Sequence, residues 1–193
     1  MRWMRFERDG QTGFGQVSGG QVLEHRGDLF GVNEPTGAAW PLEGLRFLPP
    51  CEPRMLYGLW NNFRASAERN GWAAPLEPLV FAKSVHSLIG HEGAIAPPAA
   101  GVGRVAYEGE LALVMARDTW AVSVEDAPKH IFGYTCANDL TALELLPQDP
   151  SFMQWTRAKS GDGFCPLGPW IDTEFDPMGA SLHTVVGGRE RQH

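Results

Sequence analysis

The stretch that decides the fold carries two glutamates separated by one glycine and followed by an apolar run, Tyr107-Glu108-Gly109-Glu110-Leu111-Ala112-Leu113-Val114-Met115. The apolar run is rich in strand formers, so the sequence predicts a β-strand here. Alternate residues of a strand share a face, so the side chains of Glu108 and Glu110 point the same way. At ~3.3 Å of rise per residue, their carboxylates lie roughly 6–7 Å apart.

Two carboxylates at this separation repel each other by about 2–3 kcal/mol at an effective dielectric constant of about 20. On an exposed face, solvent and salt screen most of this repulsion, and the pair would then be ordinary surface residues. In a cleft, the pair requires a proton, an Arg or Lys side chain, or a divalent cation. The Glu-Gly-Glu pattern alone does not decide between these alternatives.

Composition narrows the class of protein. The chain has 193 residues, of which 43% are hydrophobic and 7 are Trp, so a sizeable core is expected. The formal net charge of -7 argues against binding to nucleic acid. No run approaches the roughly 18 apolar residues of a membrane span, and the N-terminus lacks the apolar segment of a signal peptide. The 3 Cys form no zinc or disulfide pattern, which predicts a cytoplasmic protein with reduced thiols.

Turn residues divide the chain into a small N-terminal unit and a larger second unit. Gly 23 and Pro 15 indicate many turns and therefore a β-rich fold. Residues 1–50 read as a small β domain, with a Ser-Gly-Gly turn at 18–20 between two short strands. Pro-rich residues 49–53 form the link. Residues 51–193 form the second unit.

Local patterns in the second unit predict both strands and helices. Strands are expected near residues 55–59, 79–83, 134–137 and 166–171, and a Gly-Gly hairpin is expected in the tail after residue 182. Lys83 ends the second of these strands and either points into a cleft or extends to water, and the spacing favours water. One helix is predicted at 61–70, capped by Asn61 or Asn62 and stopped by Gly71. Another is predicted from the capping box at 123–126 to a stop at Gly133.

Asp139 follows the strand at 134–137 and is placed at the start of a helix, where an Asp commonly serves as a cap. It is also the third carboxylate of a set with Glu108 and Glu110. Three oxygen donors without a nearby Cys or His pair suit Mg²⁺ or Mn²⁺, and Ca²⁺ less well, whereas zinc prefers nitrogen and sulfur. Lys159 would lie beside the metal as a charge partner or as an acid/base.

Several short motifs, taken together in order and spacing, resemble the fumarylacetoacetate hydrolase family. They are Tyr107-Glu108-Gly109-Glu110-Leu111, Gly133-Tyr134-Thr135, Asn138-Asp139-Leu140-Thr141-Ala142, Ala158-Lys159-Ser160 and Pro166-Leu167-Gly168-Pro169-Trp170. The likeness covers about residues 55–192 and becomes specific only as a set. Residues 1–50 are similar to the small N-terminal β domain of bacterial hydroxyhepta-diene-dioate isomerases.

The resemblance implies a fold, a metal site and a class of reaction. The fold is of the α+β class and β-rich, a mixed β-roll with short helices, commonly assembled as a homodimer. The family holds a divalent metal through residues that correspond to Glu108, Glu110 and Asp139, and its active-site lysine corresponds to Lys159. The cation stabilises enolate charge on an oxo-acid during C–C cleavage, decarboxylation or tautomerisation.

Three departures from the family pattern qualify this expectation. Arg64 stands where many hydrolytic and decarboxylating members carry a His, and Arg cannot act as a general base at neutral pH. Glu68, one turn later, is then the second catalytic candidate beside Lys159, although it can also form an ordinary salt bridge with Arg64. Leu143 and Leu146 replace an Arg and a Gln, which predicts a less polar pocket. The chain stops at His193, before the family's closing strands, which predicts an incomplete C-terminus and an exposed sheet edge.

These observations favour a metal-dependent isomerase or decarboxylase, or else a hydrolase, that acts on a small oxo- or hydroxy-diene dicarboxylate from aromatic-acid breakdown. Isomerase or decarboxylase chemistry suits the missing His better than hydrolysis does, because tautomerisation needs no activated water. The rival expectation is a catalytically impaired, metal-binding remnant or subunit of the same family. No nucleic-acid or membrane partner is expected in either case.

Overall fold

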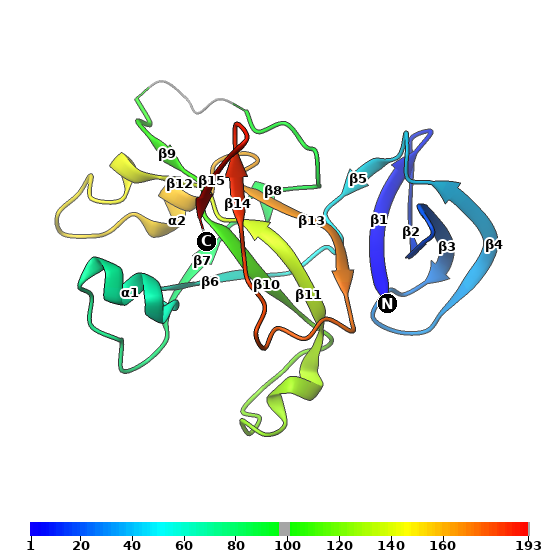
Figure 1. The fold of residues 1–193 in the computed structure, drawn as a ribbon, viewed down its shortest axis with the longest axis horizontal. Helices are drawn as coiled ribbons and strands as arrows, with labels where there is room; N and C mark the ends of the chain where they lie inside the picture. Colours follow the sequence, from blue (N-terminus) through cyan, green and yellow to red (C-terminus); the bar gives the residue numbers. More distant parts are fainter. Residues whose placement is uncertain (97–100, 193) are drawn as a thin grey trace.

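The computed structural model describes residues 1–96 and 101–192, and the largest sheet among them has nine strands. The strand order in the sheet is β10-β11-β13-β1-β2-β3-β4, with β5 paired to β1 and β8 paired to β13 (Figure 1). Its strands are β1 (Arg2–Arg8), β2 (Gln11–Ser18), β3 (Gln21–Gly27), β4 (Asn33–Pro41), β5 (Arg46–Leu48), β8 (Leu88–Ile89), β10 (Gly109–Met115), β11 (Ile131–Asn138) and β13 (Cys165–Asp172). Only the β13–β8 pairing is parallel within the described residues, so the sheet is mixed.

The N-terminal strands form an antiparallel meander around their own core. The turn at Gly19 and Gly20, with φ values of 57° and 78°, joins β2 to β3, as the sequence predicts. Buried side chains of Met4, Phe6 and Val22 fill this core. Burying large apolar side chains of this kind contributes roughly 1.5–3 kcal/mol each relative to exposure.

The sheet continues from the N-terminal meander into the rest of the chain. β1 pairs antiparallel with β13, with Trp3 opposite Ile171. Ile171 is fully buried and belongs to a cluster with Cys51 and Val114. One hydrogen-bonded sheet therefore crosses the boundary that the sequence predicts near residue 50, and the division into units 1–50 and 51–193 stays a prediction.

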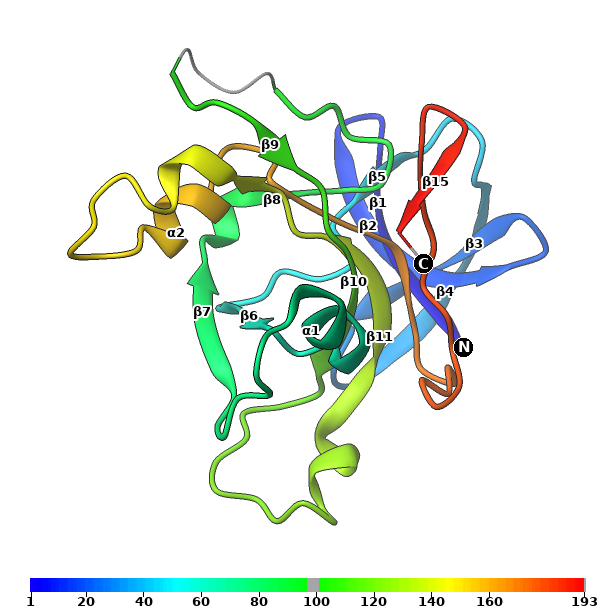
Figure 2. The same ribbon diagram turned by 60° about the vertical axis from the view of Figure 1, so that its left-hand side comes forward.

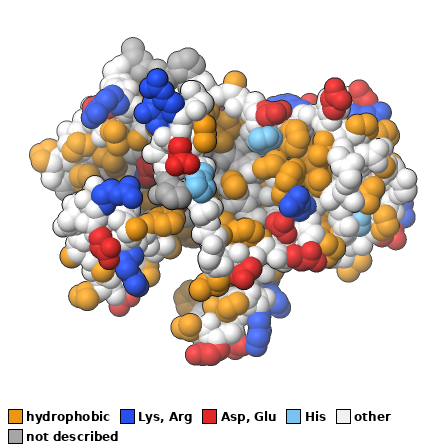
Figure 3. Space-filling model, in the orientation of Figure 1, with side chains coloured by type: hydrophobic (Ala, Val, Ile, Leu, Met, Phe, Trp, Pro, Cys, Tyr) orange, Lys and Arg blue, Asp and Glu red, His pale blue; other side chains and the backbone are white. Residues whose placement is uncertain are grey.

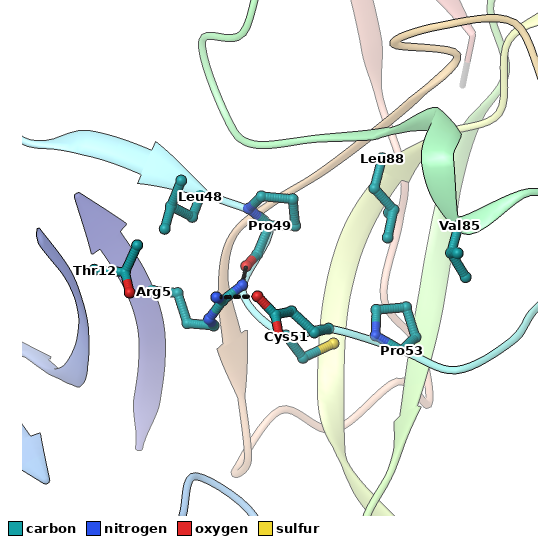
Figure 4. Close-up of a pocket in the computed structure, with 9 residues that line it drawn as sticks. Arg5, Thr12, Leu48, Pro49, Cys51, Pro53, Val85 and Leu88 are labelled. Carbon is teal, nitrogen blue, oxygen red and sulfur yellow. Dashed lines mark hydrogen bonds and ion pairs between the residues drawn. The ribbon is translucent and has the colours of Figure 1, made fainter. Parts of the chain in front are cut away.

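A cavity of about 390 Å³ lies where residues 49–53 leave the N-terminal strands (Figure 4). The Arg5 guanidinium donates a hydrogen bond to the carbonyl of Pro49 at 3.2 Å and pairs with the carboxylate of Glu52. Burial raises the pKa of the nearby Cys51 thiol to about 11. None of the site residues expected from the sequence lines this cavity.

Three small two-stranded sheets and several short helices complete the described structure. The small sheets are β6 (Leu56–Trp60) with β7 (Leu79–Lys83), β9 (Val105–Ala106) with β12 (Thr141–Ala142), and β14 (Thr184–Val186) with β15 (Arg189–Gln192). The helices are α1 (Arg64–Asn70), α2 (Trp155–Lys159) and the 3₁₀ turns η1 (Val85–Ser87), η2 (Ala127–His130) and η3 (Leu143–Leu145). The β-rich fold with short helices is as expected, and no described helix is long and apolar enough to cross a membrane.

The helix predictions are only partly correct. α1 begins at Arg64 after Phe63, which makes no side-chain cap, so the predicted cap at Asn61 or Asn62 is wrong. Gly71 ends α1 in the left-handed conformation, with φ of 68°, as predicted. The prediction of a helix that starts at Asp139 is also wrong, because β12 follows Asp139 and a 3₁₀ turn begins only at Leu143.

The segment between β10 and β11 projects below the sheet and contains only one short turn of helix (Figures 1 and 3). Ser123 accepts a hydrogen bond from the Asp126 backbone at 3.2 Å, so the capping interaction forms. The predicted helix stop at Gly133 is wrong, because Gly133 lies inside β11. A Cβ atom there would lie 2.7 Å from the carbonyl oxygen of Asp172, so glycine allows β11 to approach β13 closely.

Candidate active site

Pairing between β10 and β11 brings two of the predicted site carboxylates together. Gly109 lies opposite Asn138 in this antiparallel pair, so Glu108 and Asp139 occupy adjacent positions at one end of it. The Asp139 backbone N–H donates to the carbonyl of Glu108 at 2.8 Å, and the Glu108 N–H donates to the Asn138 side chain at 3.1 Å. Figure 2 shows the two strands running side by side. Sheet register therefore positions carboxylates that are distant in the sequence.

Lys159 joins these carboxylates from the end of α2. Its side chain is 3% exposed, and its ammonium nitrogen lies 2.5 Å from Oδ2 of Asp139. The same nitrogen lies 3.2 Å and 3.3 Å from the two carboxylate oxygens of Glu108. The structure thus places Lys159 in contact with two of the three carboxylates that the sequence singles out.

A second buried lysine reaches Asp139 from the opposite oxygen. Lys83, at the end of β7, is 5% exposed in its side chain and lies 2.7 Å from Oδ1 of Asp139. It also donates to the carbonyl oxygens of Leu140, at 3.2 Å, and of Lys159. The expectation that Lys83 extends to water is therefore wrong, because backbone and carboxylate oxygens replace its hydration. Burial lowers the pKa of the Lys83 ammonium, and Asp139 opposes that shift.

Glu110 shares the acidic environment of Glu108 and Asp139. Burial, followed by the negative charges of Glu108 and Asp139, raises the pKa of Glu110 to about 7, whereas Lys159 acts in the opposite direction. Thr141 donates a hydrogen bond to Oε1 of Glu108 and is itself buried. Burial and the neighbouring negative charges therefore favour the protonated form of Glu110.

The set of donor atoms fits a hard cation. Mg²⁺ and Mn²⁺ prefer carboxylate oxygens, and Glu108, Glu110 and Asp139 supply such oxygens within one electrostatic environment. Across residues 1–96 and 101–192, however, no group of three or more His, Cys, Asp or Glu side chains is arranged to hold a metal ion as it stands. In the arrangement described, the Lys159 ammonium supplies the positive charge between Glu108 and Asp139. The role of the three carboxylates as metal ligands stays a prediction.

Glu68, the other predicted catalytic residue, lies exposed on α1. No ion pair joins Glu68 to Arg64 anywhere in the described part of the chain. A catalytic role for Glu68 stays a prediction, and the contacts that define the site come from β7, β10, β11 and α2 instead.

Aromatic side chains to which the sequence analysis assigned no role lie beside Lys159. The Lys159 nitrogen lies 4.7 Å from the ring centre of Phe81, and Phe81 stacks on Trp155 at 5.5 Å. Such a cation–π contact stabilises a buried ammonium. Phe81 precedes Lys83 by two residues in β7 and shares its face, so the sequence linked Phe81 to Lys83 and gave no signal of its contact with Lys159.

Comparison with known proteins assigns the chain to a family. The family profile described as fumarylacetoacetate (FAA) hydrolase C-terminal matches residues 56–193. This chain belongs to the fumarylacetoacetate hydrolase family. A second profile, described as Rv2993c-like, N-terminal, matches residues 1–50. The family therefore accounts for the part of the chain that carries Glu108, Glu110, Asp139 and Lys159.

Several members of the fumarylacetoacetate hydrolase family are similar to this chain. Protein Rv2993c of Mycobacterium tuberculosis is 37% identical over 189 residues, which cover 96% of this chain and 69% of that protein. The crystal structure of 2-hydroxyhepta-2,4-diene-1,7-dioate isomerase from Mycobacterium marinum superposes with a TM-score of 0.88 at 34% identity, covering 100% of this chain and 74% of that one. The 4-hydroxyphenylacetate degradation bifunctional isomerase/decarboxylase of Salmonella dublin is 33% identical over 140 residues, or 71% of this chain and 32% of that protein. The chain covers 69%, 58% and 54% of the length of three curated relatives, of which Rv2993c is the first.

Proposed function

We propose that this chain is a metal-dependent isomerase or decarboxylase that acts on a small oxo- or hydroxy-diene dicarboxylate. One observation carries the proposal: the Lys159 ammonium contacts both Glu108 and Asp139, in the same acidic group that includes Glu110. A buried lysine amine can carry a proton, and the carboxylates beside it can bind a cation. The activities named for the Mycobacterium marinum and Salmonella dublin relatives support the reaction class.

Glu108, Glu110 and Asp139 would hold Mg²⁺ or Mn²⁺, with Ca²⁺ a poorer fit. A bound cation would supply Lewis-acid stabilisation of negative charge on the oxygen atoms of an oxo-acid. Burial, and after it the negative charges of Glu108 and Asp139, raise the pKa of Glu110 to about 7, and a bound cation would offset both effects. Lys159 already acts in that direction.

Lys159 is the residue to which we assign proton transfer. Conversion of a 2-hydroxy-diene to its 2-oxo isomer removes a proton from the hydroxyl group and adds one to a chain carbon, so no water is consumed. The Lys159 nitrogen is buried and held on several sides, by Glu108, Asp139 and the Phe81 ring. This arrangement can hold a proton at a fixed place beside a bound substrate while excluding bulk water.

The proposal is tested by following a 2-hydroxy-diene dicarboxylate through the loss of its ultraviolet absorbance. We expect turnover that requires Mg²⁺ or Mn²⁺, stops on chelation and is lost in Glu108→Ala. Glu125→Ala is the matched control, because Glu125 is an exposed glutamate outside the site. Full activity in the presence of chelator and in Glu108→Ala would overturn the mechanism. We further propose a homodimer, which light scattering on the same sample measures.

A non-catalytic, metal-binding role is the second candidate. Both Arg64 and Glu68 are exposed, and the partly buried Leu146 packs against an apolar cluster instead of supplying a polar group. Calorimetric titration with Mg²⁺ and then with oxalate, an enolate mimic, separates the two candidates. Binding of both without turnover across a panel of oxo-acids would favour the non-catalytic role.

A further inference from the structure

The glycine between Glu108 and Glu110 lies against the C-terminal hairpin formed by β14 and β15. The Gln192 side chain accepts a hydrogen bond from the Gly109 N–H at 2.8 Å and donates one to the Gly109 carbonyl at 2.9 Å. Thr184, on the other strand of the hairpin, donates to the same Gln192 oxygen at 3.0 Å. One side-chain amide thus satisfies both backbone groups of Gly109.

This contact lies at the open margin of the main sheet. β10 is the first strand in the sheet order, so only β11 pairs with it in the described structure. The backbone hydrogen bond from Asp139 to Glu108 lies on the side of β10 that faces β11. The N–H and carbonyl of Gly109 therefore face away from β11, toward the hairpin. Unpaired backbone groups of this kind are costly when they are partly buried, and Gln192 pairs them as a neighbouring strand would.

Only glycine permits this approach. A Cβ atom at position 109 would lie 2.2 Å from Oγ1 of Thr184 and 3.2 Å from the Gln192 side-chain oxygen. Both distances are shorter than ordinary van der Waals contact, so a larger residue requires the side chains of Thr184 and Gln192 to move away from Gly109. The glycine in the Glu-Gly-Glu motif thus leaves room for the side chains of the hairpin to approach β10.

We propose that Gln192 is a positioning residue that fixes the backbone between the two glutamates, so that Glu108 and Glu110 are held ready for a cation. The expected effect on metal binding rests on the proposed metal site. The hydrogen bonds between Gln192 and Gly109, called the tether below, are present in the protein without metal. Groups that orient the ligands of a metal affect its affinity by about 10–100-fold when they are removed. Gln192 acts here through the backbone of its neighbour and touches neither the substrate nor a carboxylate.

The test uses the whole chain with Gln192→Met, which keeps the length of the side chain and removes both hydrogen bonds. Arg191→Met is the matched control, because Arg191 is exposed on the same strand. We expect amide hydrogen exchange at Gly109 to accelerate at least about tenfold in Gln192→Met, since its N–H loses its acceptor. We expect Mn²⁺ to bind about tenfold more weakly, measured at a temperature where both variants are fully folded.

A second variant, Gly109→Ala, approaches the same contact from the other side and should weaken Mn²⁺ binding in the same way. Unchanged exchange at Gly109 in Gln192→Met would overturn the tether. Faster exchange with unchanged Mn²⁺ affinity would overturn the positioning role and reduce Gln192 to an anchor for the hairpin. Failure of the unmodified protein to bind Mn²⁺ would instead count against the proposed function, while the exchange measurement would still decide the tether.

Discussion

The two carboxylate oxygens of Asp139 bind two different lysines, with Lys159 at 2.5 Å from Oδ2 and Lys83 at 2.7 Å from Oδ1. Asp139, which directly follows β11, therefore links the ends of β7 and α2 at a single side chain. The two lysines have different surroundings, because Lys83 also donates to backbone carbonyls whereas Lys159 also contacts Glu108. Lys83 is bound as a structural cation, and Lys159 faces the acidic group in which we place the chemistry.

Replacing Lys159 by Met should separate catalysis from cation binding. We expect turnover of a 2-hydroxy-diene dicarboxylate to fall by at least about 100-fold, since general acid/base groups contribute about 10²–10⁴-fold. Mn²⁺ affinity should be equal or higher, because the Lys159 ammonium competes for Glu108 and Asp139. The matched control is Lys129→Met, an exposed lysine. Turnover within twofold of the unmodified protein would remove Lys159 from the mechanism.

The ionisation of Glu110 should appear in the pH dependence of stability when chelator keeps the protein free of metal. Its folded-state pKa of about 7 lies above the ordinary value of 4.5. The folded protein therefore holds this proton more tightly, so the stabilisation is complete below about pH 4.5 and is lost as pH rises through about 7. Glu110→Gln cannot ionise at this position, so it should not lose stability in this way as pH rises.

We accordingly expect the melting temperature of Glu110→Gln, relative to the unmodified protein, to increase from about pH 5 to about pH 8. Differential scanning calorimetry in buffer with chelator measures this trend. Glu77→Gln, at an exposed position, is the control and should show a flat difference. A constant difference for Glu110→Gln across this range would show that Glu110 is already ionised at pH 5.

Ile171 should be a sensitive reporter of the continuity of the sheet. Its side chain is 0% exposed, and it pairs with Trp3 across the β1–β13 ladder. Ile171→Ala should lower the free energy of unfolding by about 2–5 kcal/mol, because the lost methyl groups leave a cavity. Urea unfolding followed by tryptophan fluorescence measures the loss. Val185→Ala, at a position 61% exposed, should stay within about 0.5 kcal/mol of the unmodified protein.

The cysteines should differ in their rates of alkylation. Burial raises the pKa of Cys51 and of Cys165 to about 11, so few of these thiols are ionised near pH 8. Cys136 is exposed. Iodoacetamide should therefore label Cys136 first, and mass spectrometry of the digested protein identifies the modified site. Equal labelling of Cys51 under native conditions would contradict the burial described for it.

Sequence patterns predicted the elements that local chemistry determines. The strand at 79–83 and the Gly19–Gly20 turn depend on nearby residues and were predicted correctly. The tail hairpin was also predicted correctly, with Gly187 and Gly188 at φ values of 57° and 73°. The two glycine turns can be predicted without the tertiary structure because glycine tolerates the positive φ that a tight turn needs.

The errors arose where packing overrides the local pattern. Gly133 was interpreted as a helix stop, but it serves the close approach of β11 to β13. Lys83 was expected in water because no residue near it in the sequence indicates a partner. Asp139 is distant in the sequence and contacts Lys83 only in the folded chain. α2 was missed because its five residues lack a capping side chain. The grouping of Glu108, Asp139 and Lys159 was first suggested by their residue types and was strengthened by the family resemblance, and the contacts now described give it a geometric basis.

The hydrogen-bonded ladder between β1 and β13 has a practical consequence for protein engineering. Residues 1–50 look like a removable module in the sequence, yet deleting them would strip backbone partners from β13 and uncover Ile171. The shortened chain would then present a bare, apolar strand to solvent and invite self-association. Domain shuffling within this family should therefore exchange β13 together with the N-terminal strands that it pairs with.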